Sequence, residues 1–231
     1  MRFLIFSDIH GNQYAWRTFL KYTQNIKYDY MVFLGDIFGY YYGQAEIIDG
    51  LSSIERLIWL KGNHDQFFLD MMDNKISYLD LESNYGSTYR RIYQNGEWMR
   101  KLVKPLSFSC QLQVDGLNIF FCHGTPKDPL NGRCYPRDNW KSTDCQNYDI
   151  IIAGHTHFRM IQKGGGKLWL NVGSLGQPRD GKESCCLLFD TKEQKFEYVD
   201  LLYEKTFLFQ EVAEKDPNLH KLKDIWERKN I

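Results

Sequence analysis

The sequence predicts an α/β fold in which one β-sheet packs on another and α-helices lie outside them. Short apolar runs rich in branched and aromatic residues recur along the chain, and polar or glycine-containing turns follow them. These runs alternate with helical stretches early in the chain, whereas the second half is rich in strands. With 231 residues, 43% of them hydrophobic, the chain is long enough to bury a sizeable core.

Nine segments read as strands, and they are residues 2–7, 30–34, 56–60, 108–114, 117–122, 149–153, 167–171, 185–190 and 196–202. Helices are expected at residues 13–25, 44–53 and 86–101. The glycine run 164–166 lies between two expected strands and predicts a hairpin tip, not a phosphate loop. The final segment, from about residue 206, looks helical around Val212 and residues 219–226, with a break at Asp216. We expect one domain over residues 1–231.

The charge balance and the beginning of the chain restrict the function. Lys plus Arg (29) equals Asp plus Glu (29), which argues against a protein held on nucleic acid by bulk charge. The first apolar run, residues 3–6, ends at Asp8 and His10, too early for the core of a signal peptide. No apolar stretch has the length of a membrane span. The sequence therefore predicts a cytoplasmic protein without membrane contact.

Cysteine usage agrees with a reducing compartment. The six cysteines stand at positions 110, 122, 134, 145, 185 and 186, and no two of them form a Cys-x-x-Cys pair. Cys110 and Cys122 lie on two expected strands that could form a hairpin, but a reducing cytosol would keep them as thiols. We therefore expect small buried thiols and no structural disulfide.

Polar side chains collect directly after the expected strands. They fall in five blocks, which are Asp8-x-His10, Gly35-Asp36, Gly62-Asn63-His64-Asp65, Cys122-His123-Gly124 and Gly154-His155-Thr156-His157. The carboxyl ends of strands in open α/β sheets are where ligands collect, so these blocks should converge. One buried histidine is more often a core residue than a ligand, but this many unpaired polar groups at an apolar edge are costly unless they bind something. The pattern predicts a metal centre.

The chemistry of the donors limits which ions they would hold. Imidazole mixed with carboxylate and amide oxygen suits borderline ions such as Mn, Fe, Zn, Co or Ni, and the absence of thiolates from the blocks disfavours a closed structural zinc site. Seven ligands would serve two ions if one carboxylate bridged them. The seven are Asp8, His10, Asp36, Asn63, His123, His155 and His157.

At these residues the sequence resembles the calcineurin-like metallophosphoesterase superfamily, whose pattern is Asp-x-His, Gly-Asp, Gly-Asn-His-Asp/Glu, His and Gly-His-x-His in that order. Further segments resemble its small prokaryotic phosphodiesterase-like branch, and they are residues 7–12, 35–40, 123–126 and 171–179. Val172 stands where that branch usually carries proline. Residues 39–41, Gly-Tyr-Tyr, stand where protein Ser/Thr phosphatases carry Asp-Arg-Gly, which counts against a protein phosphatase.

The resemblance implies a fold, a cofactor and a reaction. The fold would be a four-layer sandwich of two mixed β-sheets flanked by helices. One metal would be held by Asp8, His10, Asp36 and His157, and the other by Asp36, Asn63, His123 and His155. Asp36 would then be the bridge. The two divalent ions, Mn first and Fe, Zn, Ni or Co as alternatives, would form a bridging hydroxide that hydrolyses a phosphodiester.

Other outcomes remain open at this stage. The chain has no nucleophile motif, which agrees with direct attack by hydroxide. The same centre could hydrolyse a phosphoanhydride or a phosphomonoester, or could be a nuclease, although the balanced charge counts against nucleic acid. The superfamily also resembles a retromer subunit that lacks some of the histidines, so a non-catalytic scaffold is the alternative class. We expect a small phosphorylated substrate, and nucleotide-like chemistry and homo-oligomerisation are both open.

Several residues outside the ligand set are candidates for the reaction. His64 would donate a proton to the leaving group or stabilise the charge that develops there. Asp65 would either orient His64 or be a surface carboxylate that caps the next helix. Arg179 would bind the substrate phosphate with its guanidinium fork, or it would be an ordinary surface arginine; Arg133 is a weaker candidate. Asn12 would either reach the substrate or begin the first helix, and the second is favoured.

The aromatic stretch of residues 38–42 follows the expected bridging carboxylate and includes three consecutive tyrosines. It could wall a pocket that stacks on a ring, pack in the core, or form an interface between subunits.

Overall fold

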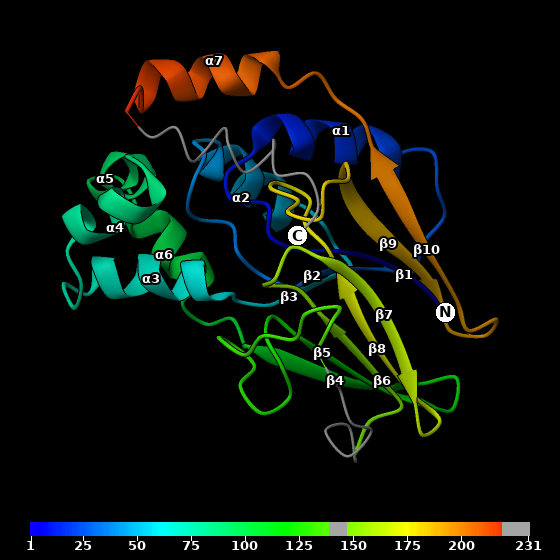
Figure 1. Cartoon of the computed structure of the whole chain (residues 1–231). Coiled ribbons are helices and arrows are strands. Elements are labelled where there is room, and N and C mark those ends of the chain that lie inside the picture. The colour runs from blue at the N-terminus through cyan, green and yellow to red at the C-terminus, as the bar shows by residue number, and fades with distance from the viewer. Residues whose placement is uncertain (139–146, 219–231) are drawn as a thin grey trace.

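Two five-stranded mixed β-sheets pack face to face in the computed structural model, which describes residues 1–138 and 147–218 (Figure 1). The layer between the sheets is built from alternate strand residues, among them Phe3 and Ile5 of one sheet and Phe121 and Ile152 of the other. Such alternation turns one face of each strand toward the other sheet. The predicted fold class, two mixed sheets flanked by helices, is confirmed.

The first sheet has three parallel strands at its centre and one edge, and two antiparallel strands at the other edge. In spatial order its strands are β10 (Lys195–Leu201), β9 (Ser184–Asp190), β1 (Arg2–Phe6), β2 (Tyr30–Phe33) and β3 (Leu57–Trp59). Parallel neighbours need a crossover, and helices α1 (Gln13–Thr23) and α2 (Gln44–Ser52) supply it. Both pack on the outer face of this sheet, where Trp16, Phe19 and Ile47 join Phe6 in the larger core.

The second sheet has a parallel centre with an antiparallel strand at each edge. In spatial order its strands are β4 (Ser109–Val114), β5 (Leu117–Cys122), β6 (Ile150–Ala153), β8 (Lys167–Val172) and β7 (Arg159–Gly164). Its outer face carries a smaller cluster that includes Trp169 and Met160, against which Cys134 and Tyr148 pack from the segment between β5 and β6. The loops that carry the expected ligands follow β1, β2, β3, β5 and β6.

Four short helices lie between β3 and β4, to one side of the sheets (Figure 1). They are α3 (Asn63–Met72), α4 (Tyr78–Tyr85), α5 (Thr88–Tyr93) and α6 (Glu97–Val103). The helix expected at residues 86–101 is thus two helices, because Gly96, a poor helix former, caps the start of α6. Helices α3 and α4 were not anticipated, since α3 begins inside the ligand block and α4 has one buried residue, Leu81.

The remaining differences from the expected elements have local causes. Strand β7 was not anticipated, because an edge strand with polar residues at alternate positions lacks a continuous apolar run. The glycine run is the hairpin tip between β7 and β8, with Gly165 and Gly166 at positive φ, as predicted. Cys110, Cys122, Cys185 and Cys186 are free thiols. Within the described residues, no helix is long and apolar enough to cross a membrane. The helix expected over residues 219–226 lies outside the described residues.

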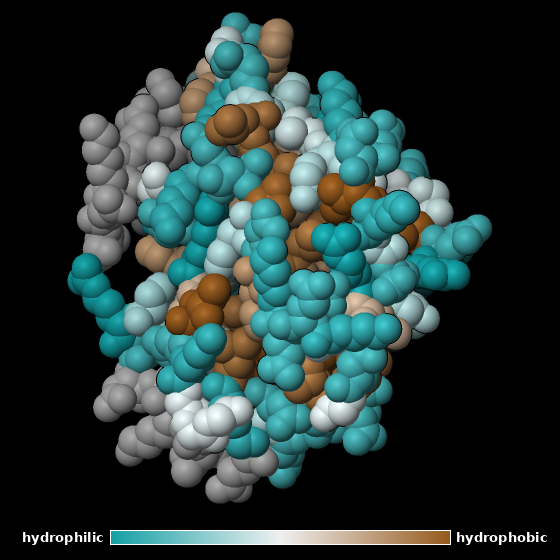
Figure 2. Space-filling model, turned by 90° about the vertical axis from the view of Figure 1, so that its right-hand side faces the viewer, coloured by the Kyte–Doolittle hydropathy of each residue, from teal (hydrophilic) through white to brown (hydrophobic). Residues whose placement is uncertain are grey.

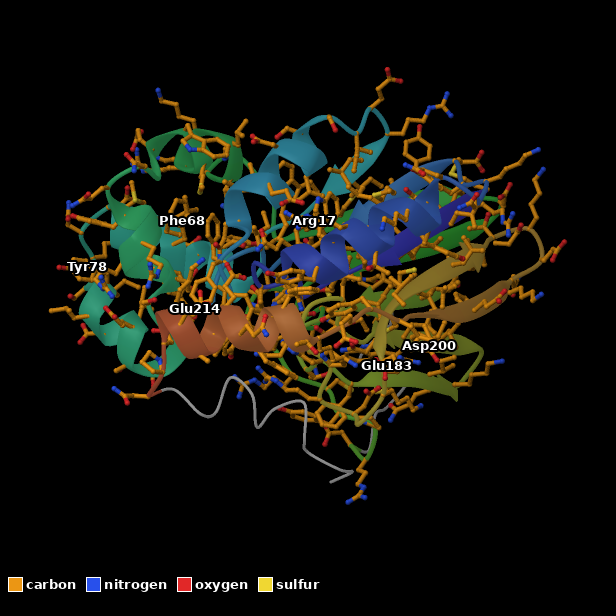
Figure 3. The ribbon with its side chains drawn as sticks, turned by 90° about the horizontal axis from the view of Figure 1, so that it is seen from above. Arg17, Phe68, Tyr78, Glu183, Asp200 and Glu214 are labelled. Carbon is orange, nitrogen blue, oxygen red and sulfur yellow. The ribbon has the colours of Figure 1, made fainter. Side chains whose placement is uncertain are left out.

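Helix α7 (Thr206–Lys215) lies over α1 and reaches toward α4 and α5 (Figures 1 and 3). The break expected at Asp216 is present, since Asp216 is the C-cap of α7. Its carboxylate accepts hydrogen bonds from the Tyr42 hydroxyl at 2.5 Å and from the backbone N–H and the hydroxyl of Ser87 at 3.0 Å each. Burial and this hydrogen bond raise the pKa of Tyr42. Asp216 therefore links three parts of the chain: α7, the tyrosine stretch and the beginning of α5.

One side of the molecule, which presents the edges of both sheets, is mostly hydrophilic with separate hydrophobic patches (Figure 2). Exposed apolar side chains include Leu202 and Phe207, 72% and 60% exposed, in and just before α7. Single apolar residues on a surface are ordinary in soluble proteins, and these two carry no argument about function.

We expect Asp216→Ala to lower the free energy of unfolding by about 1–3 kcal/mol, because it removes a charged acceptor shared by Tyr42 and Ser87. Urea unfolding followed by circular dichroism measures this loss. Glu214→Ala removes an exposed carboxylate from the same helix and is the matched control (Figure 3). Equal stabilities of the two variants would contradict the assignment of Asp216 as a structural link.

Candidate metal centre

The expected ligands stand in tight turns whose backbone is strained. Five of the seven have the positive φ that non-glycine residues seldom adopt, and they are Asp8 (55°), His10 (49°), Asp36 (68°), His155 (68°) and His157 (63°). Such a conformation costs about 1–3 kcal/mol per residue and persists only where the surroundings impose it. Here the backbone N–H groups of Asp8 and His10 donate to the carbonyls of Gly35 and Asp36, both at 3.0 Å, which ties the first two turns together.

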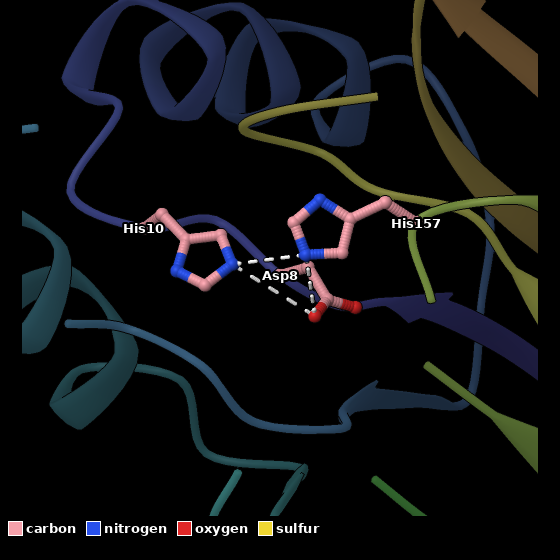
Figure 4. A group of neighbouring side chains, drawn as sticks. All are labelled: Asp8, His10 and His157. Carbon is pink, nitrogen blue, oxygen red and sulfur yellow. Dashed lines mark hydrogen bonds and ion pairs between the residues drawn. The ribbon is translucent and has the colours of Figure 1, made fainter. Parts of the chain in front are cut away.

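One group of ligands consists of Asp8, His10 and His157, whose donor atoms face one another (Figure 4). The Nε2 atoms of His10 and His157 are 3.1 Å apart, and Asp8 Oδ1 lies 3.3 Å from His157 Nε2. The Nδ1 atoms of the two rings bond to the backbone carbonyls of Phe38 at 2.7 Å and of Gln177 at 2.6 Å. Because a carbonyl only accepts, Nδ1 carries the proton in both rings and both Nε2 lone pairs point inward.

These inward-facing donors fit a cation. Two lone pairs at 3.1 Å repel each other unless a proton or a positive ion lies between them. Asp8 Oδ1 is buried and accepts no hydrogen bond within the described part of the chain. A buried carboxylate oxygen without a donor is costly, and a metal ion would satisfy it.

A second group consists of Asp36, His123 and His155, joined by Asn63. His123 Nε2 lies 3.3 Å from Asp36 Oδ2, 3.0 Å from Asn63 Oδ1 and 3.2 Å from His155 Nδ1. The other nitrogen of His123 donates to the carbonyl of Leu34 at 3.0 Å, so its Nε2 atom also faces inward. Ligands bound to one ion at about 2.0–2.3 Å lie roughly 3–4 Å from one another, which these separations match.

The carboxylate of Asp36 lies between the two groups. Its Oδ1 accepts from the backbone N–H of His64 at 2.9 Å, and its Oδ2 lies 3.7 Å from His10 Nε2 and 3.3 Å from His123 Nε2. Gly62 makes this possible, because a Cβ at that position would lie 2.1 Å from Asp36 Oδ1. The structure therefore brings all seven expected ligands together, with Asp36 in the position of a bridge.

A cavity of about 170 Å³ opens beside the two groups. Its lining is mostly polar and includes three tyrosines and two arginines beside the expected ligands. The residues are Asp36, Tyr40, Asn63, His64, Tyr85, Arg133, Tyr135, His155, His157 and Arg179. A ligand in this cavity would lie next to both groups of expected ligands.

Comparison with known proteins agrees with the site. The sequence model of the calcineurin-like phosphoesterase superfamily domain matches residues 1–194. The chain belongs to this superfamily. An uncharacterised protein of Methanocaldococcus jannaschii is 28% identical in an alignment of 228 residues, and the match covers 87% of each chain.

Solved structures share the fold of this phosphoesterase. A hypothetical protein of Pyrococcus horikoshii has a TM-score of 0.76 and 17% identity, with 98% of this chain and 96% of that chain covered. A metallophosphoesterase of Sphaerobacter thermophilus has a TM-score of 0.74 and 22% identity, with 93% and 94% covered. At these identities the likeness concerns the fold alone.

The charges of the phosphoesterase site depend on one another. Burial alone would raise the pKa of Asp8, but His157 and His123 outweigh it and hold the pKa well below its usual range. Burial likewise acts to raise the pKa of Asp36, and His123 reverses it. Burial alone would lower the pKa of His123, but the Asp36 carboxylate raises it to about 9. In the metal-free site, His123 is therefore an imidazolium at neutral pH, with a proton on each ring nitrogen.

His64 and Asp65 begin helix α3, and the structure separates their roles. His64 lines the cavity, and burial lowers its pKa to about 4. Asp65 is fully buried, and its carboxylate accepts from the backbone N–H groups of Asp36, Ile37 and Gly62 at 2.8–2.9 Å. These contacts contradict the catalytic role predicted for Asp65. Its oxygens bond to the backbone of the ligand loops and cap α3, and helix capping was the alternative prediction for this residue.

The two residues predicted to bind substrate, Asn12 and Arg179, lie in different surroundings. Asn12 is fully buried; its oxygen caps α1 through Ala15 N–H, and its Nδ2 donates to the Gly176 carbonyl and the Tyr203 hydroxyl at 2.8 Å each. The expectation that Asn12 binds substrate is therefore wrong, and the favoured helix-start alternative is confirmed. Arg179, by contrast, lines the cavity, so it is not an ordinary surface arginine.

Two arginines lie at the cavity. Arg179 Nη2 donates to the Tyr40 hydroxyl at 3.0 Å and to Gln177 Oε1 at 2.9 Å, which leaves donors of the guanidinium for another partner. Arg133, the weaker candidate, donates from Nε to His155 Nε2 at 3.0 Å. Of the tyrosine stretch, Tyr40 lines the cavity whereas Phe38 and Tyr41 are fully buried in the core.

Tyr85, Tyr89 and Tyr135 were not anticipated at the site. Tyr85 and Tyr135 line the cavity, and the Tyr89 hydroxyl contacts His64. Tyr89 falls within the helix expected over residues 86–101, where a core tyrosine and a site tyrosine look alike in sequence. The only signal that could have found these residues was their position between ligand blocks.

We expect divalent metal to bind more tightly as pH rises from 7 to 9. The pKa of a histidine is ordinarily near 6.5, whereas that of His123 in the folded metal-free protein is about 9, so its imidazole is protonated at pH 7. The stability that this protonation contributes is lost as pH rises through 9. A metal ligand must lose its proton, so binding below pH 9 releases one from His123. Calorimetric titration with Mn²⁺ in buffers of different ionisation enthalpy counts the protons released. Proton release that is absent at pH 7 would contradict the prediction.

Proposed function

We propose that this protein is a dinuclear metal-dependent phosphoesterase that hydrolyses phosphodiester bonds. The observation that carries the proposal is the placement of Asp36 Oδ2 between two groups of inward-facing donors, 3.7 Å from His10 Nε2 and 3.3 Å from His123 Nε2. Membership of the calcineurin-like phosphoesterase superfamily supports hydrolysis of phosphoric esters in general. A shared carboxylate is the feature that favours two ions over one.

The two divalent ions, Mn in our proposal and Fe, Zn, Ni or Co as alternatives, would neutralise phosphate charge and lower the pKa of a water between them. Asp8, His10 and His157 would hold one ion with Asp36, and Asn63, His123 and His155 would hold the other. Backbone carbonyls orient three of the imidazoles, so the donors are in place before an ion binds.

The chain itself supplies contacts to the rest of the phosphate ester. Arg179 would donate to phosphate oxygens that the ions leave free, and its fork suits two oxygens of one phosphate. The Tyr40 hydroxyl, which accepts from Arg179, fixes the position of that guanidinium. His64 would donate from its ring to the oxygen of the leaving group and stabilise the charge that develops there.

The cavity favours a small substrate with a planar group. Its aromatic members, Tyr40, Tyr85 and Tyr135, could contact a ring, and its volume of about 170 Å³ is small. We propose a small phosphorylated substrate of nucleotide-like chemistry, acted on in the cytoplasm. Phosphoanhydrides and phosphomonoesters are the alternative substrates, and a panel of all three classes with Mn, Ni, Fe and Zn would choose among them.

We expect metal-dependent hydrolysis of an aryl phosphodiester, and its loss in two variants for different reasons. Asp36→Asn should bind less metal and lose activity, because the shared carboxylate charge is removed. His64→Ala should keep its metal and lose about 10²–10⁴-fold in kcat. Metal content by elemental analysis and initial rates separate the two effects.

Gln66→Ala is the control for these variants, since Gln66 lies on α3 close to His64 but bonds to Asp70. It should retain full activity. Full activity in both Asp36→Asn and His64→Ala would sink the proposal, and a folded wild-type protein inactive with every metal would favour the scaffold alternative.

We expect Arg179→Met to reduce kcat/KM by roughly 10–100-fold, because a charge-assisted hydrogen bond to phosphate is lost. Lys182→Met removes the same charge from an exposed position three residues away and should have no effect. The measurement is steady-state kinetics on the same diester. Similar kcat/KM values for the two variants would exclude Arg179 from substrate binding.

A further inference from the structure

We propose that Tyr89 is a positioning residue that holds His64 in the tautomer with its proton on Nε2, from which the neutral imidazole would donate a hydrogen bond to the leaving-group oxygen. The Tyr89 hydroxyl lies 3.0 Å from His64 Nδ1. Tyr89 is fully buried on α5, and His64 is 6% exposed in the first turn of α3. The inference rests on the proposed function, in which His64 assists the leaving group.

The direction of this hydrogen bond follows from its surroundings. The tyrosine hydroxyl has one proton and two acceptors within reach: His64 Nδ1 at 3.0 Å, and the His64 carbonyl, a competing acceptor for the same proton, farther away at 3.3 Å. That carbonyl belongs to helix α3, where it accepts from the backbone N–H four residues on. Burial raises the pKa of Tyr89 far above its usual value, so the phenol keeps its proton. The hydroxyl therefore donates to Nδ1, and in a neutral imidazole the proton is then on Nε2.

The loop that carries Asp36 cannot supply an alternative partner from residue 39. Gly39 has a φ of 89°, and a Cβ on it would lie 2.5 Å from His64 Nδ1. The absence of a side chain there leaves room for the imidazole, so its partner comes from the helical segment between β3 and β4. Gly39 also begins the segment, residues 39–41, in which this chain has Gly-Tyr-Tyr where protein Ser/Thr phosphatases carry Asp-Arg-Gly.

The His64 ring is also packed by other rings, which restricts its rotation. The ring centroids of Tyr85, His10 and Phe67 lie 4.5, 4.8 and 5.4 Å from that of His64. Packing alone would allow the two tautomers, since a proton on either nitrogen does not change the shape of the ring. The hydrogen bond from Tyr89 is what distinguishes them, and it leaves Nε2 for the cavity that His64 lines.

The position of Tyr89 depends in turn on α5 and its neighbours. Helix α5 begins after Ser87, whose backbone and hydroxyl are bonded to Asp216 at the end of α7. The leaving-group donor is thus oriented from a part of the chain that lies outside the loops carrying the metal ligands.

Tyr89→Phe tests the inference because it keeps the ring and its packing and removes only the hydroxyl. On aryl methyl phosphodiesters, kcat should fall about tenfold for a phenyl leaving group and much less for p-nitrophenyl, with KM and metal content unchanged. A basic leaving oxygen needs the donor, whereas a stabilised one does not. Tyr93→Phe is the matched control: it removes a tyrosine hydroxyl from the same helix, where it donates to Asn74 at 3.0 Å. It should leave both rates unchanged.

Two further measurements keep the inference open to refutation. In the His64→Ala background, Tyr89→Phe should have no additional effect, because its action passes through the imidazole. Nitrogen NMR of the His64 ring in the metal-free protein should show a proton on Nε2 in the wild type and a mixture in Tyr89→Phe. Equal losses for both leaving groups, additive effects in the double variant, or a wild-type proton on Nδ1 would each overturn the role of Tyr89.

These outcomes are distinguishable from failure of the proposed function. If the wild-type protein hydrolyses no ester with any metal, the phosphoesterase proposal fails, whatever the tautomer of His64. If the wild type is active and His64→Ala is not, but Tyr89→Phe is indistinguishable from Tyr93→Phe, then the inference on Tyr89 alone is wrong.

Discussion

The site depends on one buried carboxylate, that of Asp36. Its side chain is 1% exposed, and its two oxygens have separate partners: Oδ1 accepts from the His64 N–H, and Oδ2 faces His10 and His123. A buried carboxylate is stable only if it is paired or hydrogen-bonded, so the turns around it must supply donors or positive charge. Two features agree with this requirement. Gly62 has no Cβ that would collide with Oδ1, and other expected ligands stand in strained turns around the carboxylate.

A second buried carboxylate, Asp65, supports the first without entering the cavity. It collects the N–H groups of the loops after β2 and β3, and so keeps Asp36 and the beginning of α3 in register. Burial and the neighbouring Asp36 carboxylate raise the pKa of Asp65 to about 7. Two buried carboxylates this close together repel each other. Positive ions that balance the charge of Asp36 would make the arrangement favourable.

The ligands and the cavity wall come from different parts of the fold. Strand-end turns carry the expected ligands, whereas α4 and the segment after β5 carry Tyr85 and Tyr135 of the cavity lining. Helix α5 carries Tyr89, which lies behind the cavity against His64. Asp216 joins α7 to the beginning of α5 and to Tyr42. The expected ligands and the aromatic part of the cavity lining therefore lie largely on separate structural elements, which is common where one fold serves several chemistries.

The sequence by itself determined the layered fold and the seven expected ligands. Periodic apolar runs reveal strands, and polar blocks at strand ends must meet at one edge because parallel strands share a direction. Only the tertiary structure placed Asp65 and Asn12 in hydrogen bonds inside the protein. It also placed Arg179 at the cavity and Tyr89 against His64. Each depends on a contact between distant segments, such as the 25 residues from His64 to Tyr89. Local patterns report burial and turn chemistry, but helix packing decides which polar atoms are used inside the protein and which face a substrate.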